Sequence, residues 1–277
     1  KDTAEGIGFY EFIKKLDKNF DSNAELLVKQ LVRAQMCIFR KENLTLSLTG
    51  EFNFKSLLEG EMLQFNRMLY EMPCVKAVPT FNMEKKNEGF KTASKVQYVA
   101  SGGCFEKEGQ EYTGALKVLK TIFSYDYLWV NVRVTGGAYG CMCSFSRNGY
   151  GFFTSYRDPN LSATLNVYKK AAEYVRNFEA GQRDMTKYII GTISGIDQPL
   201  EPAALGDRSF HAYQSGVTVE MIQKERNQVL DATEETIRSL AGYIETMMDA
   251  GTVCAIGNDR KLEEEKELFK QVSSLTQ

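Results

Sequence analysis

One arginine and one tyrosine are the first candidates for chemistry in this sequence, because a segment of small residues separates them. Arg133 precedes Tyr139 by six positions, and Gly136, Gly137 and Ala138 lie between them. Glycine carries no Cβ, so it lets a backbone or a ligand approach closely. This spacing could place the guanidinium and the phenol on one wall of a cleft.

The same glycines also fit a purely structural role. Gly136, Gly137 and Gly140 would then serve a tight turn against which Tyr139 packs, and the spacing alone favours this alternative. A phosphate cradle fits poorly, because no Lys-Ser/Thr pair follows the glycines and a strand, not a helix, is predicted after them.

The elements around this loop are predicted to be strands. Trp129–Val134 alternates apolar and polar residues with the period of a strand, and Cys141–Phe145 is strand-like as well. Asn148-Gly149 predicts a hairpin turn, because both residues tolerate positive φ. Phe152–Ser155 would be the returning strand, so the loop would join two elements of one sheet.

The composition is that of a globular protein. Its 277 residues are 43% hydrophobic and 25% charged, which allows one large domain or up to two ordinary ones. The net charge of −2, with both signs interspersed, predicts no nucleic-acid partner. No apolar run approaches the roughly 20 residues that span a bilayer, and no signal-peptide pattern opens the chain, so we predict no membrane association.

Histidine and cysteine limit the metal chemistry that this chain could perform. His211 is the single histidine, which excludes zinc motifs with two histidines and favours a hydrogen-bonded residue in a helix or turn. We therefore predict no metal site. The six cysteines are scattered; Cys141 and Cys143 would share one strand face as small hydrophobes. This usage favours the cytoplasm or another reducing compartment over a disulfide framework.

Helical and strand patterns are mixed along the rest of the chain. They predict an α+β fold, with helices packed on one face of an antiparallel or mixed sheet. Residues 73–94 resemble an exposed connector, and 206–208 a turn. Gly50 and Gly257 each follow a predicted strand and precede a helix, which suggests two copies of one fold in tandem. The predicted helices are 9–16, 23–39, 53–70, 113–125, 159–175, 218–248 with a restart at 231–234, and 261–272; residues 185–193 form a shorter apolar segment, and the further strands are 44–48, 95–100 and 252–256.

The glycine loop resembles a segment of a known family. The run Arg133-Val-Thr-Gly-Gly-Ala-Tyr139-Gly is similar to the arginine–tyrosine segment in the C-terminal half of insulinase/pitrilysin-type zinc peptidases, and most similar to that of presequence proteases. The similarity continues through Asp158-Pro-Asn and through the stretch that ends at Gly216-Val-Thr218. It covers essentially the whole chain from about residue 95 and is weaker before it.

This resemblance implies a larger enzyme with four similar α+β domains of the mitochondrial-processing-peptidase-like fold. Two halves would close around a chamber, with unstructured peptides as substrates. Zinc and the general base would lie in the N-terminal half, in the inverted motif H-x-x-E-H, which this sequence lacks. Residues 1–85 would be the tail of the third domain with a connector, and residues 86–277 the fourth domain. The N-terminal half of the same protease would be the partner, and this chain alone would be inactive.

The resemblance also implies roles for the loop residues. Tyr139 would donate its hydroxyl to the carbonyl oxygen that becomes an oxyanion, and Arg133 would hold a substrate carbonyl or stabilise the same charge. Gly136, Gly137 and Ala138 would lie against the substrate backbone.

Two functions from other classes stay open. The chain could belong to an inactive paralogue that acts as a scaffold or assembly subunit, although such a protein does not need the pair of Arg133 and Tyr139. It could also be a stand-alone peptide-binding module. Lys95–Gly103 could present a strand edge to an extended peptide, or it could be an ordinary strand inside a sheet.

Overall fold

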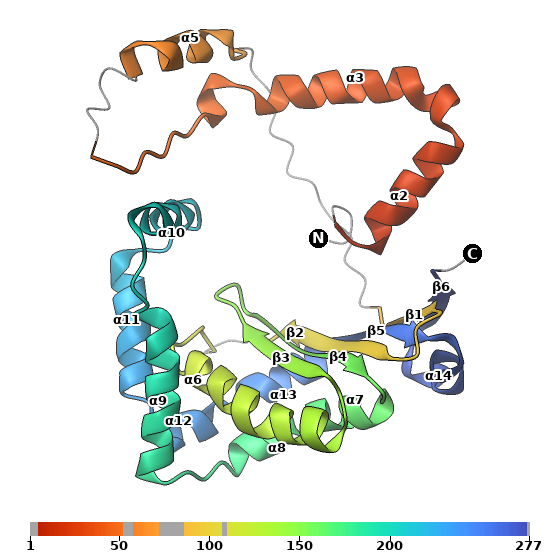
Figure 1. The fold of residues 1–277 in the computed structure, drawn as a ribbon, viewed down its shortest axis with the longest axis vertical. Coiled ribbons are helices and arrows are strands. Elements are labelled where there is room, and N and C mark those ends of the chain that lie inside the picture. Colours follow the sequence, from red (N-terminus) through yellow and green to blue (C-terminus); the bar gives the residue numbers. More distant parts are fainter. Residues whose placement is uncertain (1–4, 52–57, 72–85, 107–109, 276–277) are drawn as a thin grey trace. The chain divides into compact units, whose positions relative to one another are not determined.

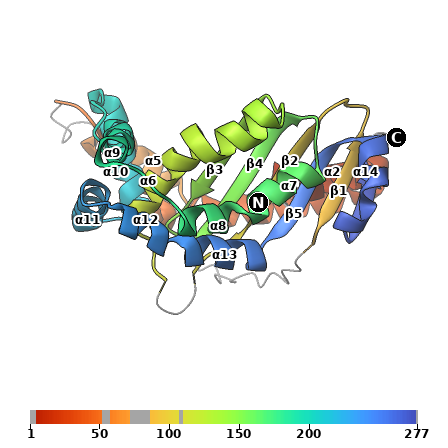
Figure 2. The ribbon, with the colours of Figure 1, turned by 90° about the horizontal axis from the view of Figure 1, so that it is seen from below.

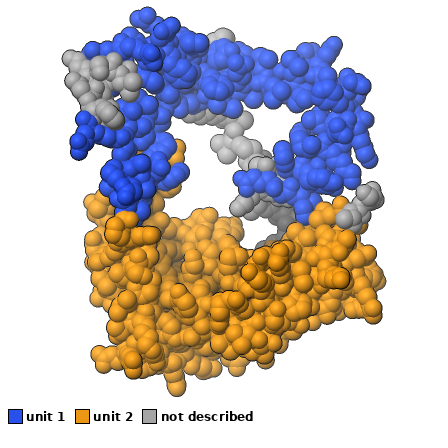
Figure 3. Space-filling model, viewed as in Figure 1, with its two compact units in different colours: residues 1–81, 200–211 blue, residues 82–199, 212–277 orange. Residues whose placement is uncertain are grey.

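The computed structural model describes residues 5–51, 58–71, 86–106 and 110–275. The chain divides into two compact units (Figure 3). Unit 1 contains residues 1–81 and 200–211, and unit 2 contains residues 82–199 and 212–277. Within the described ranges, none of the helices combines the length and the apolar character needed to cross a lipid bilayer.

Unit 2 is built on a six-stranded mixed sheet with the order β3-β4-β2-β5-β1-β6 (Figure 1). Neighbours from β3 to β5 run antiparallel, whereas β1 lies parallel to both β5 and β6. This arrangement confirms the predicted α+β class and mixed sheet. The strands are β1 Glu88–Thr92, β2 Gln97–Cys104, β3 Gly140–Phe145, β4 Tyr150–Asp158, β5 Thr252–Asn258 and β6 Gln271–Ser274.

Helices cover one face of this sheet, as predicted (Figure 2). Helices α6, α7, α8 and α13 lie along that face, and α9, α11 and α12 pack beside α6. Phe153 of β4 and Ala255 of β5 are fully buried beneath them. The helices are α6 Ala115–Ile122, η2 Phe123–Tyr127, η3 Trp129–Thr135, α7 Ser162–Lys169, α8 Ala171–Arg176, α9 Gln182–Ile196, α11 Val219–Leu230, α12 Glu234–Ser239, α13 Ala241–Ala250, α14 Asp259–Glu264 and η4 Lys266–Leu268.

The opposite face of the sheet exposes large apolar side chains. Tyr98 of β2, Met142 of β3 and Phe152 of β4 are all exposed. Side chains alternate between the two faces of a strand, so these residues point away from the helical layer. One face of the sheet therefore forms the core, and the other presents an aromatic surface.

Unit 1 consists of helices that bury little. Helices α2 and α3 contain no buried residue, and apolar side chains such as Phe12, Leu31 and Ile38 are exposed. Large exposed apolar faces are typical of interaction surfaces. The helices are α2 Ile7–Lys18, α3 Phe20–Ile38, η1 Lys41–Asn43, α5 Glu61–Met68 and α10 Pro202–Gln214, of which α10 begins in unit 1 and ends in unit 2.

The main correction concerns the segment before the glycine loop. Trp129–Val134, predicted as a strand, is helical, and α6 continues through η2 and η3 as one helix up to Thr135. Only Val132 of this last stretch is buried, whereas Val130 and Val134 are exposed. The alternating valines therefore do not form the buried face of a strand. Burial at Leu128 and Val132 continues the helical spacing of the buried face of α6.

Four further predictions were wrong. Residues 44–48 are irregular chain, so the strand before Gly50, and with it the proposed repeat, is not found there. The predicted turn at 206–208 lies inside α10. The connector 73–94 contains β1, while residues 72–85 lie outside the described ranges. The helix predicted for 261–272 ends at Glu264 and gives way to β6.

The hairpin and the helix start at Thr218 are confirmed, whereas the helix predicted to start at Pro159 begins at Ser162. Gly149 has φ of 80° and its N–H donates to Ser146 O at the turn between β3 and β4. Thr218 caps α11 by accepting a hydrogen bond from Met221 N. Strand β2 lies between β4 and β5. Both edges of β2 are paired with neighbouring strands, so Lys95–Gly103 does not offer a free strand edge to a peptide. The alternative, an ordinary strand inside the sheet, is correct.

Candidate functional site

The glycine loop ends a helix instead of joining two strands. Gly137 has φ of 79°, in the left-handed region, and its N–H donates to Arg133 O at 3.0 Å. Ala138 N donates to Val132 O at 3.1 Å. This is a glycine cap on the last turn of the helix, and it satisfies carbonyl groups that the helix leaves unpaired. Arg133 therefore lies on the last helical turn, and Tyr139 follows directly after the cap.

Gly136 is required for a different reason. A Cβ at this position would lie 2.5 Å from Val132 O, so a larger residue would push the loop away from the helix. The Gly136 carbonyl accepts a hydrogen bond from Asn160 Nδ2 at 2.6 Å. Asn160 in turn follows Asp158, which accepts from Asn160 N and from Thr164 Oγ1. Asp158 thus anchors the turn before α7 and holds Asn160 against the loop.

Arg133 and Tyr139 line the same hollow on the surface of unit 2. This open hollow has a volume of about 460 Å³. Four of the five predicted site residues lie on it, and Gly136 does not line it. Val134 and Arg157 also line it, and the sequence analysis did not single them out. The full set is Arg133, Val134, Gly137, Ala138, Tyr139 and Arg157.

The guanidinium of Arg133 stacks on an aromatic ring. Its Cζ lies 3.9 Å from the ring centre of Trp129, one helical turn earlier. A planar guanidinium stacks well on an aromatic face and leaves its N–H groups free at the edge. In the part of the chain that the structure describes, Arg133 forms no ion pair. The side chain is thus held in place by the ring of Trp129 and not by a carboxylate.

Tyr139 is exposed and stands beside other tyrosines. Its side chain is 62% exposed. Its ring meets Tyr156 of β4 edge to face, with 5.3 Å between ring centres, and Tyr156 lies 5.9 Å from Tyr98. These three rings extend from the hollow onto the helix-free face of the sheet. Among the described residues, the Tyr139 hydroxyl has no hydrogen-bond partner, so it can donate to a ligand.

The two neighbouring cysteines of β3 are structural. Cys143 is buried, and Cys141 is half-buried on the same face, as the sequence predicted. Burial raises the pKa of Cys143 to about 12 and also raises that of Cys141. Both side chains therefore remain neutral thiols near pH 7, and they behave as small hydrophobes.

Zinc does not fit the residues that the structure describes. Across the described ranges, no group of three or more His, Cys, Asp or Glu side chains is placed to hold a metal ion. His211 lies exposed on α10, with its ring 6.3 Å from that of Phe210. No step of the chemistry is therefore assigned to a metal bound by these residues.

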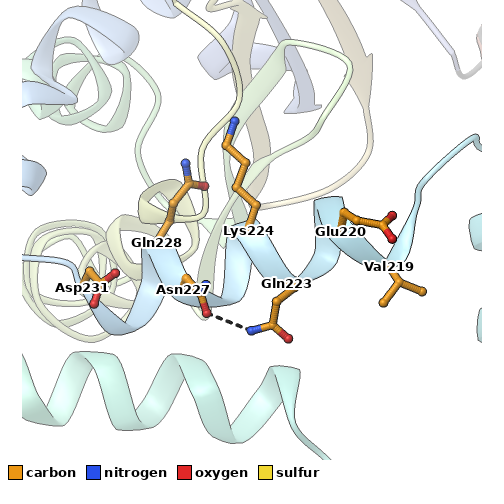
Figure 4. Close-up of a pocket in the computed structure, with 7 residues that line it drawn as sticks. All are labelled: Val219, Glu220, Gln223, Lys224, Asn227, Gln228 and Asp231. Carbon is orange, nitrogen blue, oxygen red and sulfur yellow. Dashed lines mark hydrogen bonds between the residues drawn. The ribbon is translucent and has the colours of Figure 1, made fainter.

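A second hollow lies on α11, and its polar side chains do not gather around one position (Figure 4). Its volume is about 680 Å³, and its side chains point in different directions along the helix. Gln223 Nε2 donates to Asn227 Oδ1 at 2.8 Å, so these two amides satisfy each other. Glu220 and Lys224 on the helix and Asp231 at its C-cap have mixed charges, as on an ordinary solvated helix.

Sequence comparisons identify relatives of this chain. Residues 87–259 match the family described as the PreP C-terminal domain. The chain is 38% identical over 274 residues to protein HypA of Clostridium perfringens, covering 98% of this chain and 28% of that protein. It is 30% identical over 255 residues to presequence protease 1 of Arabidopsis thaliana, covering 91% of this chain and 24% of that protein. The chain thus spans about a quarter of the length of these curated relatives.

Solved structures show the same fold at low sequence identity. The inactive peptidase M16 domain from Pseudomonas fluorescens superimposes with a TM-score of 0.53 at 15% identity, covering 78% of this chain and 52% of that one. A Helicobacter pylori protease gives a TM-score of 0.53 at 17% identity, covering 75% and 54%. The fold is thus that of the peptidase M16 inactive domain. Within that class, the chain belongs to the PreP C-terminal domain family of presequence-protease-like proteins.

Proposed function

We propose that this chain belongs to the substrate-enclosing C-terminal half of a zinc metalloendopeptidase that degrades unstructured peptides. One observation carries the proposal: Arg133 and Tyr139 line one open hollow, and both keep their hydrogen-bonding groups available there. A scaffold would have no use for a free guanidinium and a free phenol at the same place. In the proposed enzyme, the zinc and the residues that activate water belong to the other half.

Tyr139 donates its hydroxyl to the oxygen of the scissile carbonyl as water adds to that carbon. The oxygen gains negative charge in the transition state, so a donor already aimed at it lowers the barrier, by roughly 10²–10³-fold in rate for one such donor in other hydrolases. Arg133 contributes a permanent positive charge and forked N–H groups, which hold a substrate carbonyl or stabilise the same oxygen. The glycine cap fixes both residues at one end of one helix.

The tyrosine row supports an extended peptide as the ligand. Tyr98, Tyr156 and Tyr139 follow one another from the sheet face to the hollow, with their rings 5.9 and 5.3 Å apart. Exposed Phe152 and Met142 lie on the same side of the sheet. Aromatic side chains bind varied peptides by large contact area, without requiring one sequence. A peptide without fixed structure can lie along such a surface.

Unit 1 supports a partner within the same protease. Its helices α2 and α3 expose apolar side chains that the described residues do not cover. In the proposed enzyme, residues 1–85 form the end of the third domain, and residues 86–277 form the fourth. The remainder of the third domain then covers the apolar helices, and the N-terminal half closes over the hollow.

The proposal is tested by cleavage of a fluorogenic unstructured peptide. This chain alone, with zinc added, should be inactive, and a mixture with the remainder of the protease, which contains the N-terminal half and the rest of the third domain, should cleave the peptide. Activity of the chain alone would contradict the proposal and would point to a catalytic centre within it. If the mixture does not cleave the peptide, although both parts are shown to be folded and associated, the scaffold alternative is favoured.

A further inference from the structure

A second arginine of the hollow has an unusual backbone. Arg157 is the penultimate residue of β4, and its φ is 48°. Among the described residues it is the only one other than glycine with positive φ. This region is disfavoured for a residue with a Cβ, and glycine would adopt it without cost. Strained backbone of this kind clusters at functional sites, where the side chain has a use that offsets the strain.

The side chain of Arg157 lies over the ring of Tyr139. Its Cζ is 5.7 Å from the ring centre of Tyr139 and 5.6 Å from that of Tyr156. Both distances are within the range of a cation–π interaction. The Arg157 carbonyl also accepts a hydrogen bond from Tyr139 N at 3.3 Å. No ion pair of Arg157 occurs within the described ranges, so these tyrosines are its main contacts there.

Tyr139 needs such contacts because burial does not fix its ring. The side chain is 62% exposed, so the ring is free to rotate about its χ angles unless neighbours restrict it. Tyr156 restricts it from one side, through the edge-to-face contact. Arg157 approaches both rings and can hold them in this arrangement. A catalytic donor loses its effect when it is misplaced by about 1 Å.

We propose that Arg157 is a positioning residue that fixes the ring of Tyr139, so that its hydroxyl points into the hollow. This inference rests on the proposed function, in which Tyr139 donates to the scissile carbonyl. It assigns a use to the left-handed backbone at Arg157: the strained conformation directs the guanidinium of this exposed residue over the two rings. The backbone hydrogen bond to Tyr139 N does not depend on the side chain, so side-chain variants keep the loop in place.

Three variants of the intact protease test this role, with cleavage of an unstructured fluorogenic peptide as the assay. Arg157→Met keeps the length of the side chain and removes its charge. We expect kcat to fall about five- to tenfold, from the loss of contacts to two rings, while KM changes less than about twofold. Arg157→Lys should restore part of kcat, because a cation remains. Arg157→Gly should lower kcat as much as Arg157→Met, while Tm stays the same or rises, because glycine removes the backbone strain.

A double-mutant cycle separates positioning from simple charge. In the Tyr139→Phe background, Arg157→Met should change kcat less than about twofold, since the hydroxyl it positions is absent. Arg183→Met, at an exposed arginine of α9, serves as the matched control and should leave kcat unchanged. If the effects of Arg157→Met and Tyr139→Phe multiply, or if Arg157→Gly lowers Tm and kcat together, the positioning role is wrong. If Tyr139→Phe alone leaves kcat unchanged, the proposed function fails first.

Discussion

Replacing Glu225 with glutamine should destabilise unit 2 without touching the hollow. Glu225 lies on α11 and is 6% exposed. Its carboxylate accepts from Arg147 Nε at 2.5 Å and from Arg147 Nη2 at 2.8 Å, and it lies 2.8 Å from Lys117 Nζ. Arg147 follows β3, and Lys117 belongs to α6. One buried carboxylate thus joins α11 to the hairpin and to the long helix that carries Arg133.

The magnitude follows from the exposure of the three side chains. Removing one partner of a fully buried ion pair costs about 3–5 kcal/mol, whereas an exposed pair is worth about 0–1 kcal/mol. The Glu225 side chain is 8% exposed, but those of Lys117 and Arg147 are 30% and 40% exposed, so water can solvate them after the change. We expect Glu225→Gln to lower the free energy of unfolding by about 2 kcal/mol, between these limits.

The effect should depend on pH. Burial raises the pKa of Glu225, but the hydrogen bonds from Arg147 and Lys117 outweigh it and hold the pKa below its ordinary value of 4.5. A lowered folded-state pKa stabilises the fold above the unfolded-state pKa, and this contribution is lost as pH falls through the folded-state value. The difference in stability between the native chain and Glu225→Gln should therefore be full at pH 7 and should narrow below about pH 4.5.

Urea unfolding followed by fluorescence measures this difference. Trp129 is the only tryptophan of the chain and lies in unit 2, so it reports on that unit. With a slope of about 2 kcal/mol/M, a loss of about 2 kcal/mol lowers the urea midpoint by about 1 M. Glu179→Gln, at an exposed carboxylate, is the control and should shift the midpoint little. Equal urea midpoints for the native chain and Glu225→Gln at pH 7 would refute the reasoning. A difference between the two midpoints that grows as the pH falls would refute it as well.

Two further predictions concern the loop and its neighbouring strand. Gly137→Ala should lower the free energy of unfolding by about 1–2 kcal/mol, and Gly137→Asn should lower it less. The reason is backbone strain, because φ of 79° is unfavourable for alanine, whereas an added Cβ would meet only Pro159 Cγ at 3.6 Å. Equal urea midpoints for the native chain and both variants would show that the cap is not strained. Cys143 should resist iodoacetamide at pH 8 in the folded chain and react in urea, because burial raises its pKa to about 12. Mass spectrometry should find the half-buried Cys104 modified before Cys143. Modification of Cys143 before Cys104 would contradict the assigned burial.

Local chemistry explains which parts of the fold the sequence could predict. The turn at Asn148-Gly149 needs residues that tolerate positive φ, and the cap at Thr218 needs one side-chain oxygen, so a few neighbouring residues decide both. The loop after Arg133 was found for the same reason, since its glycines are needed by the local backbone. Arg133 and Tyr139 were therefore placed together correctly, although the element that carries Arg133 was not.

The failures come from packing between distant segments. Trp129–Val134 has the alternation of a strand, but the preceding helix continues into it, with Leu128 and Val132 buried against the core. Glu88–Thr92 has little strand character of its own and becomes β1 by pairing with β5 and β6. Arg157 could not be found from the sequence, because nothing in a residue type signals a left-handed conformation adopted under tertiary constraint. Such positions require the three-dimensional arrangement.

The most direct measurement of the central claim is the turnover of Tyr139→Phe in the intact protease. Phenylalanine keeps the ring and its contact with Tyr156 and removes only the hydroxyl, so Tm should be unchanged. The account predicts a fall in kcat of roughly 10²-fold, the effect of losing one donor to a developing oxyanion. Tyr125→Phe, at a tyrosine of η2 that is 69% exposed, is the matched control and should keep full activity. An unchanged kcat in Tyr139→Phe would remove the hydroxyl from the mechanism and contradict the account.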